Sequence, residues 1–271
     1  MARRPTWLAR VLSCALAAGT LLATAACSDD GGEDGSRVPG VTASQVAGKQ
    51  QTPSPAATLS EGGARTALIT EADIEDDWTQ VKETEVQNWH DSLLIGRVDV
   101  SDFLTAKAQA ADCQRLLDSL FDDDLLGRPS GVSALRGFTQ GDSRLLYQVA
   151  SYDRTDPQES LNWMAGLPQE CDEFTVTDGR DQRTVQVVDA SLPKVGDARE
   201  GLRVTVRGPI GGTEATLTLD VAAVRVGNNA ITVTAGGLDG DEQDSTGQAA
   251  RLGTQRLEDV LAGRTPAASP N

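Results

Sequence analysis

The residue types that most often carry nucleophilic or metal chemistry are scarce in this chain of 271 residues. There is one histidine, His90, and there are four cysteines, at positions 14, 27, 113 and 171. A zinc site of histidine and cysteine would therefore have too few ligands. His90 lies beside Trp89 and could act as a base, but no Gly-x-Ser-x-Gly turn is present for a nucleophile. We expect a surface or packed histidine, no catalytic constellation, no metal ion and no cofactor.

The first 26 residues have the pattern of an export signal. Arg3, Arg4 and Arg10 give a positively charged start, and the apolar run Val11–Leu22 is too short to span a bilayer comfortably. Small residues follow, directly before Cys27. The arginine pair also permits a twin-arginine signal, but the hydrophobic pair after it sits one residue late, which favours the general export route.

The segment Leu21–Ser28 resembles a bacterial lipobox. In that family the cysteine thiol receives a diacylglyceryl group, and the signal peptidase then cuts before the cysteine. The resemblance implies that Cys27 is the lipid-bearing first residue of a lipoprotein held at the extracytoplasmic face of the cell membrane. Thr24 stands where lipoboxes usually carry leucine, so plain cleavage after an Ala-x-Ala site remains the alternative.

Cys113 and Cys171 remain as an even pair after Cys14 leaves with the signal and Cys27 becomes the N-terminus. Outside the cytoplasm, an even pair of cysteines is expected to form a disulfide. The alternative is two free, buried thiols. A bond between them would join two helices across an intervening hairpin.

Three acidic clusters need an explanation: Glu75–Asp77, Asp122–Asp124 and Asp239–Asp244. The first two are expected to be exposed helix ends. The third is similar to a calcium loop, but Asp244 and Ala250 occupy the positions where an EF-hand requires glycine and glutamate. We expect a solvated loop that caps the last helix. The glycines at 208, 211 and 212 lack the lysine and helix of a phosphate loop and indicate a strand connection.

The best candidates for a ligand cleft are three tryptophans, Trp78, Trp89 and Trp163, because aromatic side chains often line binding sites. Only 4% of the chain is aromatic. In such a chain, large aromatic side chains are also the natural anchors of the core, which is the alternative for all three.

Charge limits the class of partner. The whole chain has a net charge of −16, and removal of residues 1–26 leaves 21 basic against 40 acidic residues, a net charge of −19. Such a chain repels nucleic acid and anionic lipid surfaces. With only four lysines and a bias to Ala, Gly, Arg and Asp, the composition resembles that of proteins from GC-rich actinobacteria.

Composition also divides the chain into segments. Residues 1–26 are the expected signal peptide, and residues 27–62, rich in Gly, Pro, Ser and Asp, are expected to be a lipid-anchored disordered linker. Residues 63–264 are long enough for one domain with a single core. Residues 265–271 are expected to be a disordered tail.

Helical signals occur in four places within that domain. We expect a helical turn capped by Thr70 with Ile74 and Trp78 facing inward, a helix over about 101–120, a helix that opens at Asp156 and ends at Pro168, and a helix over 245–262. The apolar stripe of the second element places Cys113 on its inner side.

Alternating apolar and polar residues predict the strands. One sheet face would be wet and the other covered, which is the antiparallel pattern. The predicted fold class is α+β, an antiparallel β-sheet with helices packed on one face. Strands are expected at 133–140, 144–152, 174–177, 183–189, 202–207, 215–226 and 230–235.

These features together resemble the extracellular sensor domain of mycobacterial PknH-type receptor kinases and its free-standing lipoprotein relatives. The resemblance covers about Leu68–Ala262, and it departs at the disulfides, since those sensor domains have two and this chain can make one. It implies a sensor-like extracellular domain. The residues that carry it are the Cys113 helix, the hairpin, Leu161–Trp163 with Cys171, Leu192–Asp197 and Val224–Asn228.

The sequence therefore favours a lipid-anchored cell-envelope protein with a non-enzymatic binding or sensor-like domain. Its partners would be the membrane, through Cys27, and an unknown small molecule or envelope protein, but not nucleic acid. A carboxylate-dependent envelope hydrolase and a structural partner of envelope proteins are the alternatives, because paired carboxylates can act without histidine.

We predict that Cys27 is acylated, because the lipobox-like segment places it at the new N-terminus. Cells labelled with a clickable fatty acid should incorporate label into the wild-type protein, whereas Cys27→Ala should be unlabelled and should appear in the soluble fraction. Equal labelling of the two proteins would contradict this assignment.

Overall fold

The computed structural model describes residues 58–74, 77–86, 99–102, 107–152, 157–178, 181–210, 212–238 and 240–267. All of these residues belong to one compact unit, Gln51–Asn271. The predictions for the signal peptide, Cys27, Trp89 and His90 fall outside the described residues.

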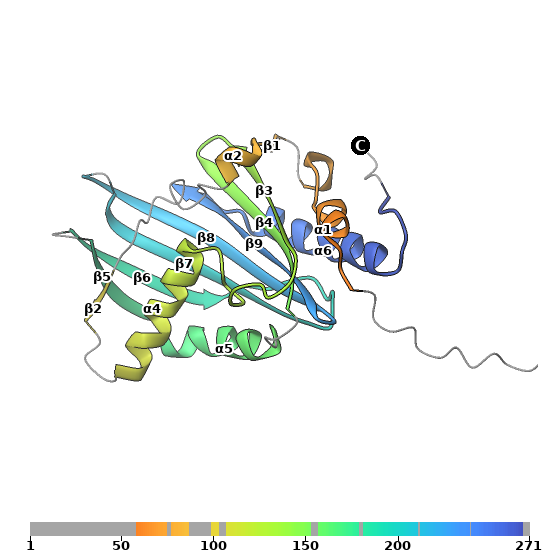
Figure 1. Cartoon of the computed structure of the whole chain (residues 1–271). Coiled ribbons are helices and arrows are strands. Elements are labelled where there is room, and N and C mark those ends of the chain that lie inside the picture. Colours follow the sequence, from red (N-terminus) through yellow and green to blue (C-terminus); the bar gives the residue numbers. More distant parts are fainter. Residues whose placement is uncertain are drawn as a thin grey trace, which may run out of the picture. The chain divides into compact units, whose positions relative to one another are not determined.

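The described residues form a sheet of nine strands in the order β1-β3-β4-β9-β8-β7-β6-β5-β2 (Figure 1). Every neighbouring pair is antiparallel. The predicted α+β class with an antiparallel sheet is therefore confirmed. The strands are β1 (Thr79–Gln80), β2 (Asp99–Asp102), β3 (Ser133–Gln140), β4 (Ser143–Ser151), β5 (Glu173–Asp178), β6 (Asp181–Asp189), β7 (Ala198–Ile210), β8 (Thr213–Val226) and β9 (Asn229–Leu238).

Two-residue turns connect four of the eight neighbouring strand pairs in this sheet. Between β3 and β4 the chain reverses at Gly141, whose φ of 55° lies in the left-handed region that glycine adopts without steric cost. The register that follows pairs Ser133 with Ala150 and Gln140 with Ser143, so β4 covers the whole inner edge of β3.

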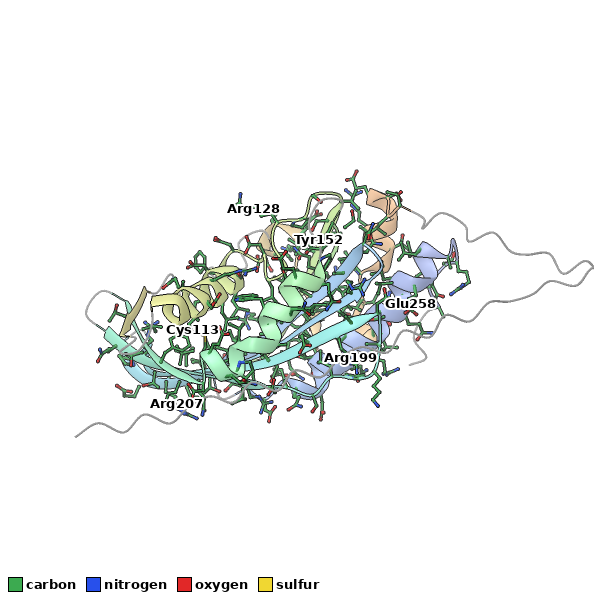
Figure 2. The ribbon with its side chains drawn as sticks, turned by 90° about the horizontal axis from the view of Figure 1, so that it is seen from below. Cys113, Arg128, Tyr152, Arg199, Arg207 and Glu258 are labelled. Atoms are coloured by element: carbon green, nitrogen blue, oxygen red, sulfur yellow. A yellow bond between two sulfur atoms is a disulfide. The ribbon has the colours of Figure 1, made fainter. Side chains whose placement is uncertain are left out.

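One face of the sheet is covered by α4 (Lys107–Phe121) and α5 (Pro157–Glu170). The predicted disulfide between Cys113 and Cys171 is present, with 5.7 Å between the Cα atoms, and it joins α4 to the residue that follows α5 (Figure 2). Both cysteines are fully buried among leucines of the two helices and valines of β5 to β8. The bond is therefore part of the first core.

The opposite face is covered by α1 (Glu61–Ala67), the 3₁₀ turn η1 (Glu71–Asp73) and α6 (Gln243–Leu261). Thr70 caps η1 together with Asp73, as its position in the sequence predicts. Close packing of α6 depends on Gly253, because a Cβ there would overlap the buried Tyr147 hydroxyl of β4. Segments from the two ends of the described domain thus share one core.

Helices on both faces are a correction to the expectation of one covered face. The reason lies in the middle of the sheet, where β4 is buried along nearly its whole length and β8 is buried from Leu219 to Val224. The predicted alternation does hold on β7, where Leu202, Val204 and Val206 face the first core and the residue after each of them is less buried.

The remaining predicted boundaries differ by a few residues. Pro168 does not end its helix but lies inside the last turn of α5, which continues to Glu170. The N–H of Cys171 donates a helical hydrogen bond to the Leu167 carbonyl at 2.7 Å. No helix among the described residues is long and apolar enough to cross a membrane.

We predict that the double variant Cys113→Ala, Cys171→Ala folds to the same structure but loses about 2–5 kcal/mol of unfolding free energy, since the bond restricts the unfolded chain over a separation of 58 residues. Urea denaturation of exported protein measures this loss, and wild-type protein under reducing agent should show the same loss. A double variant with the midpoint of the oxidised wild type would contradict the prediction.

Candidate functional site

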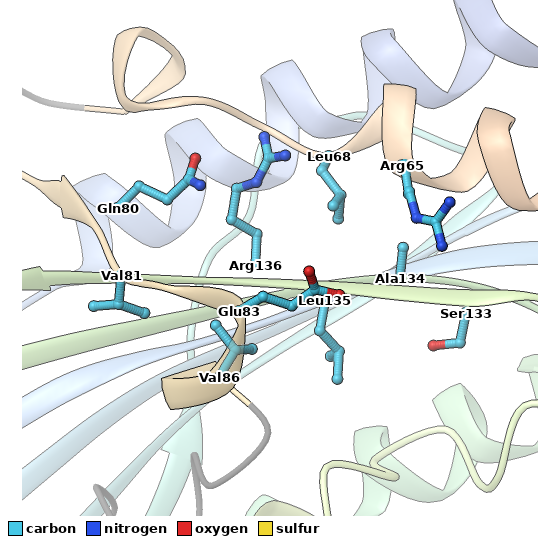
Figure 3. Close-up of a pocket in the computed structure, with 10 residues that line it drawn as sticks. All are labelled: Arg65, Leu68, Gln80, Val81, Glu83, Val86, Ser133, Ala134, Leu135 and Arg136. Atoms are coloured by element: carbon cyan, nitrogen blue, oxygen red, sulfur yellow. The ribbon is translucent and has the colours of Figure 1, made fainter.

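The candidate site is a pocket of about 440 Å³ at the β1 end of the sheet, around the outer edge of β3 (Figure 3). Its walls come from the end of α1, the loop after it, β1, the short helix α2 (Glu83–Val86) and the first half of β3. Ten residues line it: Arg65, Leu68, Gln80, Val81, Glu83, Val86, Ser133, Ala134, Leu135 and Arg136.

The pocket exists because β1 is too short to cover β3. Its two residues pair only with Phe138 and Thr139, and the N–H of Val81 adds one bond of 2.9 Å to the Gly137 carbonyl. Beyond that point the described residues contribute no strand to the outer edge of β3 between Ser133 and Arg136.

Lining residues come from both sides of the sheet. Leu68 and Ala134 belong to or pack against the core beneath α1 and α6, whereas Val81, Val86 and Leu135 belong to or pack against the core beneath α4 and α5. In Figure 3, Leu68 lies above the β3 ribbon and Val86 below it. The pocket thus reaches around a strand edge and offers an apolar surface on each side.

One wall is held by arginine side chains that reach main-chain carbonyls of the loop after α1. Arg256 of α6 donates from Nε to the Leu68 carbonyl at 3.0 Å and from Nη2 to the Thr66 carbonyl at 3.2 Å. The same guanidinium lies 3.3 Å from the buried carboxylate of Asp73. Arg136 of β3 donates from Nη1 to the Ile69 carbonyl at 2.8 Å. These bonds satisfy carbonyls at the end of a helix, which would otherwise lack partners.

The lining carries more positive than negative charge. Arg65 and Arg136 face one acidic lining residue, Glu83. Burial lowers the pKa of Arg136, and the nearby Arg256 lowers it further, while Asp73 acts in the opposite direction. A ligand carboxylate that entered the pocket would stabilise the charged form of the Arg136 guanidinium, which burial and Arg256 disfavour. Arg65 also pairs with Glu61, but both side chains are exposed, so that pair is weak.

The described lining residues have the composition of a binding site. Glycoside hydrolysis and related reactions need two carboxyl groups that face the same bond, and Glu83 is the single carboxylate among the lining residues. Among the described residues that line the pocket there is no histidine or cysteine. Apolar side chains with a few convergent polar groups are instead typical of a ligand site.

Two other pockets of about 420 Å³ are less suited to a ligand. The pocket beside the start of α6 is lined mostly by polar side chains, and Pro193 is its one apolar side chain among the described lining residues. The pocket over β5 and β6 carries three acidic residues and no basic residue in its described lining. The first is lined by Ser191, Pro193, Gln243, Asp244, Gly247, Gln248 and Arg251, and the second by Pro168, Asp172, Glu173, Gln186, Val187, Val188 and Asp189.

Trp78 and Trp163, two of the three tryptophans proposed to line a cleft, do not lie together. Trp78 is a core residue beneath α6, and its Nε1 donates to the Ser245 hydroxyl at 3.2 Å. Trp163 packs against the core on the other face, where its Nε1 donates to Asp112 at 3.0 Å and Arg115 lies 3.9 Å from its ring centre. The sheet therefore separates these two residues, and Trp89 lies outside the described residues.

The acidic loop before α6 is tied to the sheet rather than freely solvated. Asp241 pairs with Arg203, which also makes a two-pronged contact with the buried Asp220. The Asp220 carboxylate accepts the Glu242 N–H at 3.0 Å, and the buried Glu242 carboxylate accepts the Ser143 hydroxyl at 2.6 Å. Among the described residues, no three His, Cys, Asp or Glu side chains are arranged to hold a metal ion.

The Asp122–Asp124 cluster also departs from a plain exposed helix end. Asp123 follows α4 with φ of 56°, and its carbonyl accepts the Gln148 side chain at 3.3 Å. Burial, with the neighbouring Asp124 and Asp122 carboxylates, raises the pKa of Asp123 to about 7. Asp123 does not line the pockets described above.

Sequence reasoning did not single out Arg65, Leu68, Leu135 or Arg136 as site residues. Arg136 lies in a segment that was identified only as one strand of a hairpin, and nothing local marks which of its edges stays free. A usable signal was Arg136 itself. It lies two residues from both Ala134 and Phe138, so it shares their sheet face, and that face is turned toward the core. A charge on an inward face of a strand indicates a partner or a site.

Comparisons with known proteins find similarity at the level of structure. No protein-family model and no curated protein sequence matches the chain. The crystal structure of the extracellular domain of PknH from Mycobacterium tuberculosis is similar over 78% of this chain and 100% of that chain, with 12% identity and a TM-score of 0.45. The X-ray structure of the Rv0999 ortholog from Mycobacterium smegmatis is similar over 74% and 98%, with 13% identity and a TM-score of 0.38. Neither likeness is close enough to assign a ligand or a site.

We predict that Asp123 makes stability depend on pH. Its pKa is higher in the folded protein, at about 7, than the ordinary value of 3.8, so folding binds a proton between these values, and the free energy of unfolding falls as pH rises from about 4 to about 7. Asp123→Asn keeps a side chain that tolerates the left-handed backbone and removes the titration. Its stability gain over wild type should be larger at pH 8 than at pH 4 by at least about 1 kcal/mol.

Thermal or urea unfolding at the two pH values measures this difference. Asp142→Asn, at an exposed aspartate in the β3–β4 turn, is the matched control and should change stability equally at both. A gain for Asp123→Asn that does not vary with pH would contradict the assignment.

Proposed function

We propose that this chain is an exported, surface-tethered binding protein of the cell envelope whose ligand occupies the pocket at the edge of β3. The observation that carries the proposal is the pocket itself, which combines aliphatic side chains from both cores with two arginines. Such a lining can hold a ligand with an apolar body and a negative group.

Two features support a location outside the cytoplasm. The Cys113–Cys171 disulfide is typical of proteins that fold in an oxidising compartment. The basic, apolar N-terminal segment has the pattern of an export signal. Lipid attachment at Cys27, followed by the Gly- and Pro-rich segment, would hold the binding domain near the membrane and leave it free to rotate.

A binding role without catalysis is proposed because the described lining residues supply one carboxylate, whereas the hydrolase alternative needs two. Asp123, whose pKa is raised to about 7, follows α4 and does not line this pocket. The arginine wall is fixed by main-chain hydrogen bonds, which favours a preformed site over one that assembles during a reaction.

The proposal predicts that ligands perturb one place in the domain. In ¹H–¹⁵N NMR spectra, aliphatic carboxylates such as 4-methylpentanoate and short acidic peptides are the probes, and at least one of them should shift the main-chain amides of Leu68, Leu135 and Arg136. Ala134→Trp should fill the pocket and remove these shifts.

Ser191→Trp is the matched control, because it places the same side chain in the pocket beside α6. It should leave probe binding at β3 unchanged. Shifts that map to another part of the domain, or that persist in Ala134→Trp, would show that the ligand site lies elsewhere.

A further inference from the structure

We infer that the occupant of this pocket is an extended polypeptide that pairs with the free edge of β3 and presents an acidic side chain toward Arg65 and Arg136. The inference rests on the proposed binding function and names the class of ligand. It follows from three features of the pocket: a strand edge that no described strand covers between Ser133 and Arg136, a lining that alternates between the two sheet faces, and a local excess of positive charge.

The main chain of β3 points hydrogen-bonding groups into the pocket. The Gly137 carbonyl faces outward, because it accepts the Val81 N–H at 2.9 Å. In an antiparallel strand the direction alternates from residue to residue, so the N–H and C=O groups of Leu135 and Ser133 also face outward, away from β4. No backbone hydrogen bond from the described residues reaches this outer edge before Gly137.

Of the usual protections against a further strand, β3 carries one, the charge of Arg136, and that guanidinium already donates a hydrogen bond to the Ile69 carbonyl. Edge strands commonly carry lysine or proline, or are very short. The eight residues of β3 contain neither lysine nor proline. At the opposite edge of the sheet, β2 is four residues long and two of the four are aspartate. The β3 edge is thus the more open to strand addition.

The side chains around the edge match a second strand better than a compact molecule. A paired strand sends successive side chains to opposite faces of the sheet. One set would meet Leu68 and Ala134, and the other would meet Val81, Val86 and Leu135. From Ser133 to Gly137 the edge is about 13 Å long, enough for a segment of about five residues. A small rigid molecule would reach only one of these surfaces.

Charge then selects the partner's side chains. Arg65 and Arg136 lie on the face that also carries Ala134 (Figure 3), so the partner residue on that face is expected to be acidic. Glu83, on α2, is the acidic lining residue and disfavours a second acid at that end. The fitting segment therefore has one central acidic residue flanked by β-branched residues that face the aliphatic side.

The probe for the test is a fluorescent hexapeptide, acetyl-Thr-Val-Glu-Val-Thr-Val-amide, titrated into the exported chain and followed by anisotropy. N-methylation of those residues whose amides face β3 should weaken binding by at least about tenfold, because two main-chain hydrogen bonds are lost. N-methylation of the intervening residues, whose amides face away, should change it by less than about twofold. Lysine in place of the glutamate should weaken binding about tenfold, and Arg136→Gln should reduce that discrimination, since Arg65 remains as the other cation of the lining.

Leu135→Pro tests the protein side of the same bonds. It removes an N–H that faces outward, so β4 pairing should survive and the hexapeptide should bind about tenfold more weakly. Ala134→Pro is the matched control: it removes an N–H directed at β4 and should destabilise the fold. If Leu135→Pro also fails to fold, the N-methylated peptides still decide the question with wild-type protein.

The outcomes separate the inference from the proposed function. Binding of 4-methylpentanoate in the pocket, with hexapeptide binding absent or indifferent to the position of N-methylation, would overturn the peptide inference and leave the pocket as a ligand site. Self-association through the β3 edge in sedimentation, without hexapeptide binding, would also overturn it. If no probe perturbs the pocket, both fail.

Discussion

Strands β4, β8 and β9 bury side chains on both faces of the sheet, so each face needs its own cover. A single layer of helices would leave one apolar face in water, at a cost of about 25 cal/mol for each Å² exposed. The chain meets this constraint with helices from its middle, α4 and α5, on one face and with segments from both ends of the described domain, α1 and α6, on the other. Sheet architecture thus decides where the distant parts of the chain meet.

The packing of α1 and η1 against α6 explains the polar groups that are buried on this face of the sheet. The end of α1 and the loop before η1 lie on this face of the sheet, and arginine side chains from α6 and β3 donate hydrogen bonds to their carbonyls. Asp73 offsets part of the positive charge through its ion pair with Arg256. A buried carboxylate without this guanidinium would be costly, since an uncompensated charge in a core is expensive.

The strand β3 is fully paired on one edge and only partly paired on the other. Its inner edge is bonded to β4 throughout, but β1 spans two residues, and α1, α2 and the connecting loop surround the rest without adding a strand. Apolar residues from both cores therefore reach solvent at one place, beside two arginines. The disulfide is buried in the core beneath α4 and α5, where it joins α4 to the residue that follows α5, which is consistent with a structural role for that bond.

The sequence by itself determined the elements of local origin. Alternation and turn residues located the β3–β4 hairpin and the strands from β5 to β9, and the capping pattern at Thr70 located η1, because these signals depend on neighbours in the chain. Only the tertiary structure decided which strand became an edge, that Trp78 and Trp163 lie on opposite faces, and that Arg136 meets Arg256 across 120 residues of chain. Such relations depend on strand order, and strand order follows from the joint burial of two faces, which no local pattern records.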